Sequence, residues 1–364
     1  MCGIYDKMHT KKNIRRQMMS KVTIQDIADA LGVSRNTVSK AINNADGLAD
    51  ATREKILQKA VEMGYKQFSY VRAVAAVAGE EEIARPSPGF QGEIALLTTM
   101  FLGQSHFASL MLDKFQREIS QLGYTLNTHR VTPEDLKSGT LPITFVPERT
   151  SAIMCIEMFD FAYDEMICSL GLPVLFVDGP VRFCGRTLNA DQLYMDNIAG
   201  VIRFVYDMLD RGYKRLGFIG DYEHCQSFFE RYAAFRGAML MAGVEVEERF
   251  VIKANEPWDM QAPLSALTEM PDAFLCANDF VALVAMQLLS ERGFLVPGDV
   301  MLCGFDDSAE SRASKPTLTT IHIHTQAMAF SAVQLLMTRI KEPGLDYRIV
   351  HTQTDLIYRD STAR

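Results

Sequence analysis

A run of polar side chains at residues 34–40 has the chemistry to contact a DNA duplex. Arg35 can donate two hydrogen bonds to a guanine edge, Asn36 can pair with an adenine edge, and lysine or hydroxyl groups can contact bases or phosphates. Lys40 lies four residues after Asn36, so a helix would carry both on one face. Thr37 and Ser39 complete the run. These residue types at this spacing favour a helix whose outer face enters the major groove.

Two predicted helices position this run. Thr23 and Asp26 have the spacing of a capping box, and apolar residues then recur at helical spacing. Gly32 can adopt the left-handed conformation that a sharp turn requires, and Ser34 can cap a second helix through its hydroxyl. The apolar residues of the two helices are Ile24, Ile27, Ala28, Leu31, Val38, Ala41 and Ile42. They occupy one face of each helix and leave the polar run exposed.

A third predicted helix completes a small core. Asp50 can cap this helix, and Gly64 can end it. Its apolar residues are Ile56, Leu57, Ala60 and Met63. Three short helices within residues 20–66 are typical of a helix-turn-helix module. The competing interpretation makes residues 34–40 only the solvated face of a surface helix. We favour DNA binding because the caps, the turn glycine and the third helix all agree.

The head as a whole resembles the headpiece of the lactose/galactose-repressor family. The resemblance covers residues 22–65, which begin VTIQDIADALGVSRNTVSKAI. It implies that Arg35, Asn36 and Lys40 contact the bases of an operator DNA. It also implies contacts with the phosphate backbone for Thr23, Ser34, Thr37, Ser39 and Asn43. Double-stranded operator DNA is therefore the expected macromolecular partner.

The segments that flank the head depart from this family. Residues 1–19 precede the position at which members of this family usually begin. Either translation begins at a later methionine, or these residues form a basic arm that adds non-specific attraction to DNA. Residues 67–92 are the expected hinge and linker. The family inserts a hinge leucine into the minor groove, and Val74, a smaller wedge, aligns with it. The alternative is that Val74 only packs helix against helix.

Charge distinguishes the head from the rest of the chain. The 364 residues carry a formal net charge of −8. Residues 1–66 hold 12 Lys and Arg against 7 Asp and Glu, a charge of +5, which leaves −13 for residues 67–364. Only the head carries a net positive charge that would attract the phosphates of DNA. Most of that positive charge comes from the first 20 residues. Charge is therefore weak support, and the residue pattern carries the prediction.

Residues 93–364 alternate apolar strands with amphipathic helices, which predicts an α/β body. The two halves repeat this pattern. The first half opens with the apolar segment EIALLTTM and the second with RLGFIG, and each segment leads into a predicted helix. The expected fold is an all-α helix-turn-helix head followed by a two-lobed, periplasmic-binding-protein-like body of doubly wound parallel sheets. We expect the chain to cross between lobes near 189–191, 322–325 and 352–354. Ligands of such bodies bind in the cleft at the carboxyl ends of the strands.

The family resemblance extends through the body, in GLPVLFVDG, FERYAAFRGAM, PDAFLCANDF, VMLCGFDD and KPTLTTI. It implies a small-molecule effector, most often a sugar, although this fold also binds purines and other metabolites. The implied ligand contacts are Asp178, Arg231, Trp258, Asn278 and Asp306. Arginine, aspartate and asparagine suit a polyhydroxylated ligand, and a tryptophan ring can stack on a sugar face. The alternatives are capping by Asp178 and Asn278, and lobe packing by Trp258.

Other residues with chemical potential receive simpler interpretations. His322 and His324 alternate on a predicted strand, which is metal-ligand spacing, but the motif brings no third ligand, so we expect packing or an interface and no metal or cofactor. His106 and His224 fall in loops near the predicted cleft. The seven cysteines are scattered and never spaced as C-x-x-C, which predicts reduced thiols.

Two other classes of protein could share such a body. An enzyme is the first, but GxSxG, GxxxxGK[ST], GxGxxG and HExxH motifs are absent from the sequence. A periplasmic solute-binding protein is the second, but residues 1–19 lack the apolar core of a secretory signal. No apolar stretch is long enough to span a membrane, so we expect a cytoplasmic protein without a membrane partner. We expect a homodimer whose two heads contact two half-sites.

Overall fold

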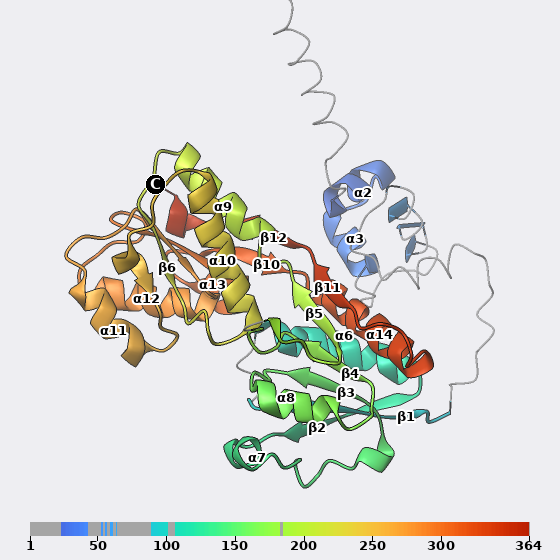
Figure 1. The fold of residues 1–364 in the computed structure, drawn as a ribbon. Coiled ribbons are helices and arrows are strands. Elements are labelled where there is room, and N and C mark those ends of the chain that lie inside the picture. The colour runs from blue at the N-terminus through green and yellow to red at the C-terminus, as the bar shows by residue number, and fades with distance from the viewer. Residues whose placement is uncertain are drawn as a thin grey trace, which may run out of the picture. The chain divides into compact units, whose positions relative to one another are not determined.

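The computed structural model describes residues 23–42, 52–53, 55–56, 59–60, 63, 89–100, 106–182 and 185–363. Its internal contacts divide the chain into two units, Met1–Pro86 and Ser87–Arg364 (Figure 1). The expected extension at 1–19 lies outside the described residues, as does the linker at 67–92 up to residue 88. Within the described part of the chain, no helix is both long and apolar enough to cross a membrane.

The head contains the two helices that the capping signals predict. Helix α2 spans Ile24–Leu31 and α3 spans Arg35–Ile42. The capping box is formed, because the Thr23 amide donates to Asp26 Oδ2 over 2.7 Å and the Asp26 amide donates to Thr23 Oγ1 over 3.2 Å. Gly32 ends α2 at φ +65°, in the left-handed region. The buried core consists of Ile27, Ala28, Val38, Ala41, Ile56 and Ala60, so residues of the third segment pack on both helices.

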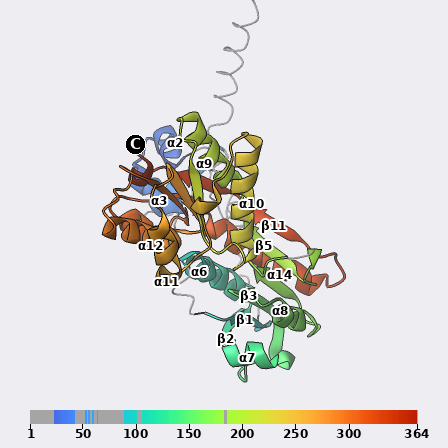
Figure 2. The ribbon, with the colours of Figure 1, turned by 60° about the vertical axis from the view of Figure 1, so that its left-hand side comes forward.

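The body is built on two six-stranded sheets, which Figures 1 and 2 show as separate lobes. The first sheet has the order β11-β5-β4-β3-β1-β2 and is entirely parallel. Its strands are β1 (Gly92–Thr98), β2 (Tyr124–Arg130), β3 (Thr150–Ile156), β4 (Val174–Val177), β5 (Asp191–Met195) and β11 (Ile349–Thr352). Strands β1, β3, β4 and β5 are almost wholly buried, as expected for parallel strands covered on both faces.

The second sheet has the order β12-β10-β9-β8-β6-β7. All its pairs are parallel except the edge pair of β10 with β12, which is antiparallel. Its strands are β6 (Leu216–Ile219), β7 (Val251–Ile252), β8 (Ala273–Cys276), β9 (Met301–Asp306), β10 (Thr319–Ile323) and β12 (Thr354–Ile357). The two-lobed α/β architecture predicted from the alternating pattern is therefore confirmed.

Helices cover both faces of each sheet. In the first lobe α6 (His106–Gln121) and α14 (Thr325–Lys341) pack on one face, and α8 (Phe161–Cys168) packs on the other. In the second lobe α9 (Ala199–Asp210) and α10 (Gln226–Met241) oppose α11 (Pro257–Ala266) and α12 (Asp279–Glu291). The remaining helical segments are α7 (Pro133–Ser138), α13 (Ala309–Ala313), η2 (Pro147–Arg149), η4 (Glu248–Phe250) and η5 (Asp360–Thr362).

Successive side chains of a strand point to opposite faces of the sheet and therefore pack against different helices. Ile94 and Leu96 of β1 join the cluster formed with α6 and α14, whereas Ala95 and Leu97 join the cluster formed with α8. This is the period of two that a strand imposes. Of the described cysteines, Cys155, Cys225, Cys276 and Cys303 are buried free thiols, and Cys168 is half-buried and also free.

The chain passes between the two sheets at three places. The first passage is at residues 196–198, the second at His324 between β10 and α14, and the third at Gln353 between β11 and β12. The last two fall inside the predicted segments 322–325 and 352–354. The first lies beyond the predicted 189–191, because β5 still pairs with β4 and β11 of the first sheet before the chain leaves it.

Candidate functional site

The outer face of α3 carries the polar residues predicted to contact DNA. Arg35, Asn36 and Lys40 are exposed, while Val38 of the same helix is buried. Ser34 caps the helix, since the Thr37 amide donates to its Oγ over 3.0 Å and the two hydroxyls are 2.7 Å apart. These bonds fix the start of α3, where recognition contacts concentrate.

The other predicted head residues play different structural parts. Thr23 is engaged in the capping box of α2. Ser39 is half-buried on α3. Asn43 and Val74 lie outside the described residues. The exposed face of α3 thus carries the side chains of Arg35, Asn36 and Lys40, and its other face packs in the hydrophobic core of the head.

Acidic residues with unusual backbone conformations lie at the carboxyl ends of strands in both lobes. Among the described residues, four non-glycine residues have positive φ: Glu157, Asp178, Asp306 and Asp307, at 56°, 61°, 118° and 58°. Glu157 follows β3, Asp178 follows β4, and Asp306 ends β9. Such conformations cost about 1–3 kcal/mol each and concentrate at binding sites. They make these strand ends the candidate ligand site.

Asp178 connects the two lobes. Its Oδ1 accepts hydrogen bonds from the Gly179 amide over 2.8 Å and, from the second lobe, from the Ser227 amide of α10 over 3.2 Å. Burial raises the pKa of this carboxyl, and the hydrogen bonds and the charge of Arg231 oppose that rise. The capping alternative therefore describes part of what Asp178 does, because it holds the first turn of a helix in the opposite lobe.

Arg231 lies one helical turn beyond Ser227 and is buried. Its Nε donates to Asn197 Oδ1 over 2.9 Å, and its Nη1 donates to the carbonyl oxygen of Ala277 over 2.6 Å. The guanidinium carbon lies 3.5 Å from the centre of the Phe305 ring. Asp306 follows that ring directly. Burial raises the pKa of Asp306 well above its usual range, although the charge of Arg231 opposes the effect.

Asn278 and Trp258 belong to the second lobe. Asn278 caps α12, because its Oδ1 accepts from the Val281 amide over 2.9 Å, so the capping alternative applies to it. Trp258, in the first turn of α11, is 71% exposed. A ring with so much surface in solvent is not packed into the core of its lobe, and contact between Trp258 and a ligand stays a prediction.

Sequence reasoning missed two residues close to the candidate site, Glu157 and Asn197. Glu157 was overlooked although it follows a buried strand in the same way as Asp178. Asn197 is fully buried, and its Nδ2 donates to Glu230 Oε2 over 2.9 Å. His224, for which the sequence analysis left ligand contact open, has its pKa lowered by burial, which Asp178, Asp221 and Glu256 oppose. Glu157 could have been predicted from its position directly after an apolar strand. The sequence around Asn197 contains no comparable signal.

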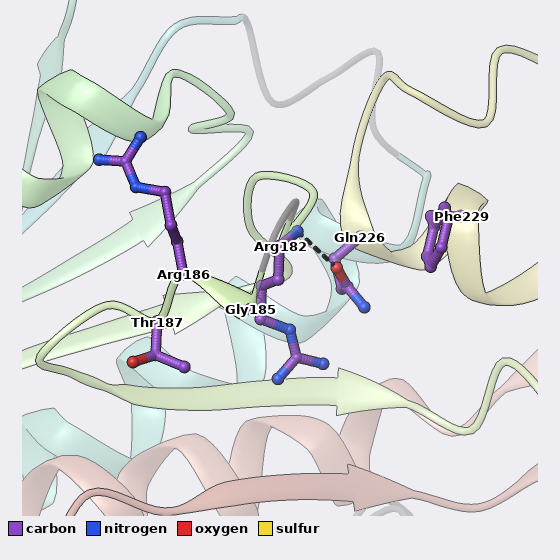
Figure 3. Close-up of a pocket in the computed structure, with 6 residues that line it drawn as sticks. All are labelled: Arg182, Gly185, Arg186, Thr187, Gln226 and Phe229. Atoms are coloured by element: carbon purple, nitrogen blue, oxygen red, sulfur yellow. Dashed lines mark hydrogen bonds between the residues drawn. The ribbon is translucent and has the colours of Figure 1, made fainter.

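An open hollow of about 300 Å³ lies between the loop after β4 and the first turn of α10 (Figure 3). It is lined by Arg182, Gly185, Arg186, Thr187, Gln226 and Phe229. The Arg182 amide donates to Gln226 Oε1 over 3.0 Å, which joins the loop after β4 to the first turn of α10. Arg182 also pairs with Glu230 over 3.4 Å, and Arg186 pairs with Glu165 over 3.3 Å. Both guanidinium groups therefore have carboxylate partners.

The histidine pair on β10 contacts carboxylates. His322 Nδ1 lies 2.9 Å from Asp307 Oδ2, and His324 Nε2 lies 3.0 Å from Asp355 Oδ2. Their rings meet edge to face at 4.9 Å. Within the described ranges, no group of three or more His, Cys, Asp or Glu side chains has a geometry that could hold a metal ion. Of the two interpretations, packing at a lobe crossing fits these contacts. The side chain of His106 lies outside the described residues.

Comparison with known families gives one match in the head and one in the body. Residues 23–67 match the model of the bacterial regulatory proteins of the lacI family. Residues 205–362 match the model of the periplasmic binding protein-like domain. The order of the two matches is that of the predicted head and body.

Curated relatives resemble the chain over most of its length. An HTH-type transcriptional repressor PurR of Mannheimia succiniciproducens is 26% identical over 350 residues, which cover 94% of this chain and 99% of the relative. The protein of the same name from Haemophilus influenzae is 26% identical and covers 93% and 98%. Because these relatives are repressors, they support neither the enzyme nor the solute-binding alternative.

Solved structures share the fold of head and body. The transcriptional regulator CelR in complex with cellobiose has a TM-score of 0.63 at 22% identity, covering 93% of this chain and 99% of its own. The lac repressor dimer bound to operator and the anti-inducer ONPF has a TM-score of 0.63 at 21% identity, covering 94% and 99%. A regulator from Alkaliphilus metalliredigens with D-xylulofuranose has a TM-score of 0.60 at 20% identity, covering 75% and 100%.

Proposed function

The chain belongs to the lactose/galactose-repressor family of DNA-binding transcriptional regulators, and from that premise we propose how its residues hold the operator and respond to an effector. Two chains form a homodimer through their bodies. Each head places α3 in the major groove of one half-site. A small molecule that closes the cleft changes the spacing of the heads and therefore the affinity for DNA.

The proposed contacts with DNA divide into base and backbone contacts. Arg35, Asn36 and Lys40 read base edges from the exposed face of α3. Thr23, Ser34, Thr37, Ser39 and Asn43 orient the helix against the phosphates. Val74 enters the minor groove as a wedge. Replacing Val74 with alanine should then reduce operator affinity and DNA bending, whereas an unchanged affinity and bend would remove Val74 from the proposal.

The proposed effector contacts are Asp178, Arg231, Trp258, Asn278 and Asp306. They combine planar donors, carboxylates and an exposed aromatic ring, and Asp178 of the first lobe accepts a hydrogen bond from the Ser227 amide of the second. Such a set suits a sugar or sugar derivative. Neighbours of the same fold have been solved with cellobiose and D-xylulofuranose, which supports this ligand class. A purine is the alternative class. We place the protein in the cytoplasm, where an operator and its effector meet.

One observation carries the DNA-binding part of this proposal: Arg35, Asn36 and Lys40 are exposed on a helix whose opposite face is buried in the head core. The test is selection of bound duplexes from random DNA by the full-length protein at moderate salt. We expect enrichment of a palindrome whose half-sites lie about one helical turn apart. A pool with no enriched sequence would refute the proposal. Metabolites are then screened for their effect on binding to the enriched site.

A further inference from the structure

Glu230 of the second lobe lies at the centre of a polar network that joins the two lobes. Its Oε2 accepts a hydrogen bond from Asn197 Nδ2 over 2.9 Å, and its Oε1 accepts one from Gln226 Nε2 over 3.0 Å. Two basic side chains of the first lobe approach the same carboxylate. Arg182 Nη2 lies 3.4 Å from Oε1, and His351 Nε2 lies 3.8 Å from Oε2. The Arg182 amide also donates to Gln226 Oε1, as Figure 3 shows.

Strand β11 holds His351 in place, two residues before the passage at Gln353. In the parallel register His351 pairs with Tyr194 of β5, and the two rings stack with their centres 5.3 Å apart and their planes at 23°. Tyr194 is fully buried, whereas the side chain of His351 is 41% exposed. The stack therefore fixes the plane of the imidazole beside Glu230 of the other lobe and leaves the ring open to exchange protons with water.

Glu230 carries its negative charge at neutral and mildly acidic pH. Burial opposes ionisation of this carboxyl, but its interactions with His351, Gln226 and Asn197 outweigh burial and lower its pKa. Histidine side chains, in contrast, change charge between about pH 5 and pH 8. The two groups therefore attract each other as opposite charges when the ring is protonated, and they lose this attraction as pH rises.

The other charged groups around the ring do not reverse the sign of this effect. Arg182 stays positive throughout this range and shares the carboxylate of Glu230. Asp196, which follows β5, accepts hydrogen bonds from two backbone amides at the start of the first passage. Helix α14, which contacts β11, has no charged residue before Arg339. Among the described residues of this network, His351 is thus the one whose charge changes between pH 5 and pH 8.

The same network reaches a proposed effector contact. Asn197 donates to Glu230 and accepts from Arg231 Nε over 2.9 Å, and it lies in the first passage between the sheets. We propose that His351 and Glu230 form a proton-dependent link between the lobes. Acidification strengthens the link, stabilises the arrangement of the lobes in this structure and thereby changes the affinity of the protein for its operator. The effect on operator affinity rests on the proposed function, whereas the link itself does not.

A double-mutant cycle tests the link without any ligand. The full-length parent, His351→Gln, Glu230→Gln and the double variant are unfolded in urea at pH 5.5 and at pH 8. At pH 5.5 the two substitutions should be non-additive by about two- to fivefold in the unfolding equilibrium constant, and at pH 8 they should be additive. A contact that does not depend on the proton would give the same interaction at both pH values. In the control cycle Glu248→Gln, at a carboxylate paired with Arg236 of α10, replaces Glu230→Gln and should not interact with His351→Gln at either pH.

If Glu230→Gln does not fold, the parent and His351→Gln decide between them. The loss of stability in His351→Gln should then be larger at pH 5.5 than at pH 8, and an equal loss at both would overturn the inference.

The second measurement is the affinity for the duplex enriched by selection, at the same two pH values. The ratio of the two affinities should differ between the parent and His351→Gln by about two- to fivefold. Equal ratios would overturn the regulatory part of the inference. If neither protein prefers any duplex sequence, the proposed function fails, and the unfolding cycle still decides whether the link exists.

Discussion

The buried guanidinium of Arg231 is hydrogen-bonded to Asn197, where the chain first crosses from one lobe to the other. The Arg231 Nε donates to Asn197 Oδ1 over 2.9 Å, and Asn197 Nδ2 donates to Ser227 Oγ over 3.2 Å. Glu230, on the same helix as Arg231, accepts from Asn197 and from Gln226. A ligand that moves Arg231 would therefore act directly on a segment that joins the two lobes.

Asn197→Ala should weaken the coupling between ligand and DNA more than it weakens either binding event. The substitution leaves Arg231 with one fewer acceptor and should cost about 1–3 kcal/mol of stability. Operator affinity is measured by fluorescence anisotropy with and without ligand, and the ratio of the two gives the coupling. A variant that keeps the full ratio would show that Asn197 does not transmit the signal. Asn255→Ala, a control at a half-buried asparagine whose Oδ1 accepts from the Asp221 amide instead of from Arg231, should keep it.

Trp258 should report ligand binding by its fluorescence. It is the single tryptophan of the chain, and 71% of its surface is exposed. If a bound ligand covers the ring, its emission should shift to shorter wavelength, and Trp258→Phe should abolish the signal while weakening binding. Emission that is the same with saturating ligand would contradict the predicted contact.

Asp164 should make the first lobe less stable as pH rises. Its carboxyl is fully buried in α8, neither oxygen has a hydrogen-bond partner, and burial together with the charge of Asp160 raises its pKa to about 8. Folding therefore binds a proton between about pH 4, where the unfolded group titrates, and pH 8. Across that window stability should fall by up to about 1.4 kcal/mol per pH unit. Asp164→Asn should flatten the slope in urea unfolding; equal slopes in both proteins would contradict the prediction.

The pair of Asp191 with Arg339 should be essential to the first lobe. Arg339 of α14 donates from Nε and Nη2 to the two oxygens of Asp191 over 3.0 and 3.2 Å, and both side chains are buried. Burial opposes ionisation of Asp191, but hydrogen bonds from Arg339 and Arg348 outweigh it and lower its pKa. The stabilisation is present above the unfolded pKa and is lost as pH falls through the folded pKa.

Asp191→Asn should lower the free energy of unfolding at pH 7 by about 3 kcal/mol, because it leaves the buried guanidinium without a counter-charge. Urea titration of the parent and variant measures the difference. Asp113→Asn, which disrupts an exposed pair on α6, should change it by less than about 1 kcal/mol. A similar small loss for both variants would show that the buried pair is not essential.

Local signals in the sequence predict the head and the strand ends well. Thr23, Gly32 and Ser34 specify a cap, a turn and a second cap through their own side chains or backbone, so α2 and α3 follow from neighbouring residues. The family resemblance implied roles for Asp178 and Asp306, and each also lies at the end of an apolar run. Glu157 has the same local signal and was missed, since the family resemblance gave it no role.

The contacts that join the lobes could not be predicted in the same way. Asn197 meets Arg231 across 34 residues of sequence, and Ser227 meets Asp178 across 49. These contacts depend on how two sheets pack, which no local pattern encodes. The first lobe crossing was placed too early for a related reason: whether β5 stays in the first sheet depends on β11, which lies more than 150 residues later.

The most direct test of the account is the base preference of an Arg35→Ala variant on the operator obtained by selection. Arg203→Ala, which removes a 70% exposed arginine from α9 of the body, is the matched control. Affinities are measured for operators that carry each base at each position. The account predicts that Arg35→Ala loses about 1–3 kcal/mol of discrimination at one base pair in each half-site and that Arg203→Ala loses none. An Arg35→Ala protein with every base preference intact would contradict it.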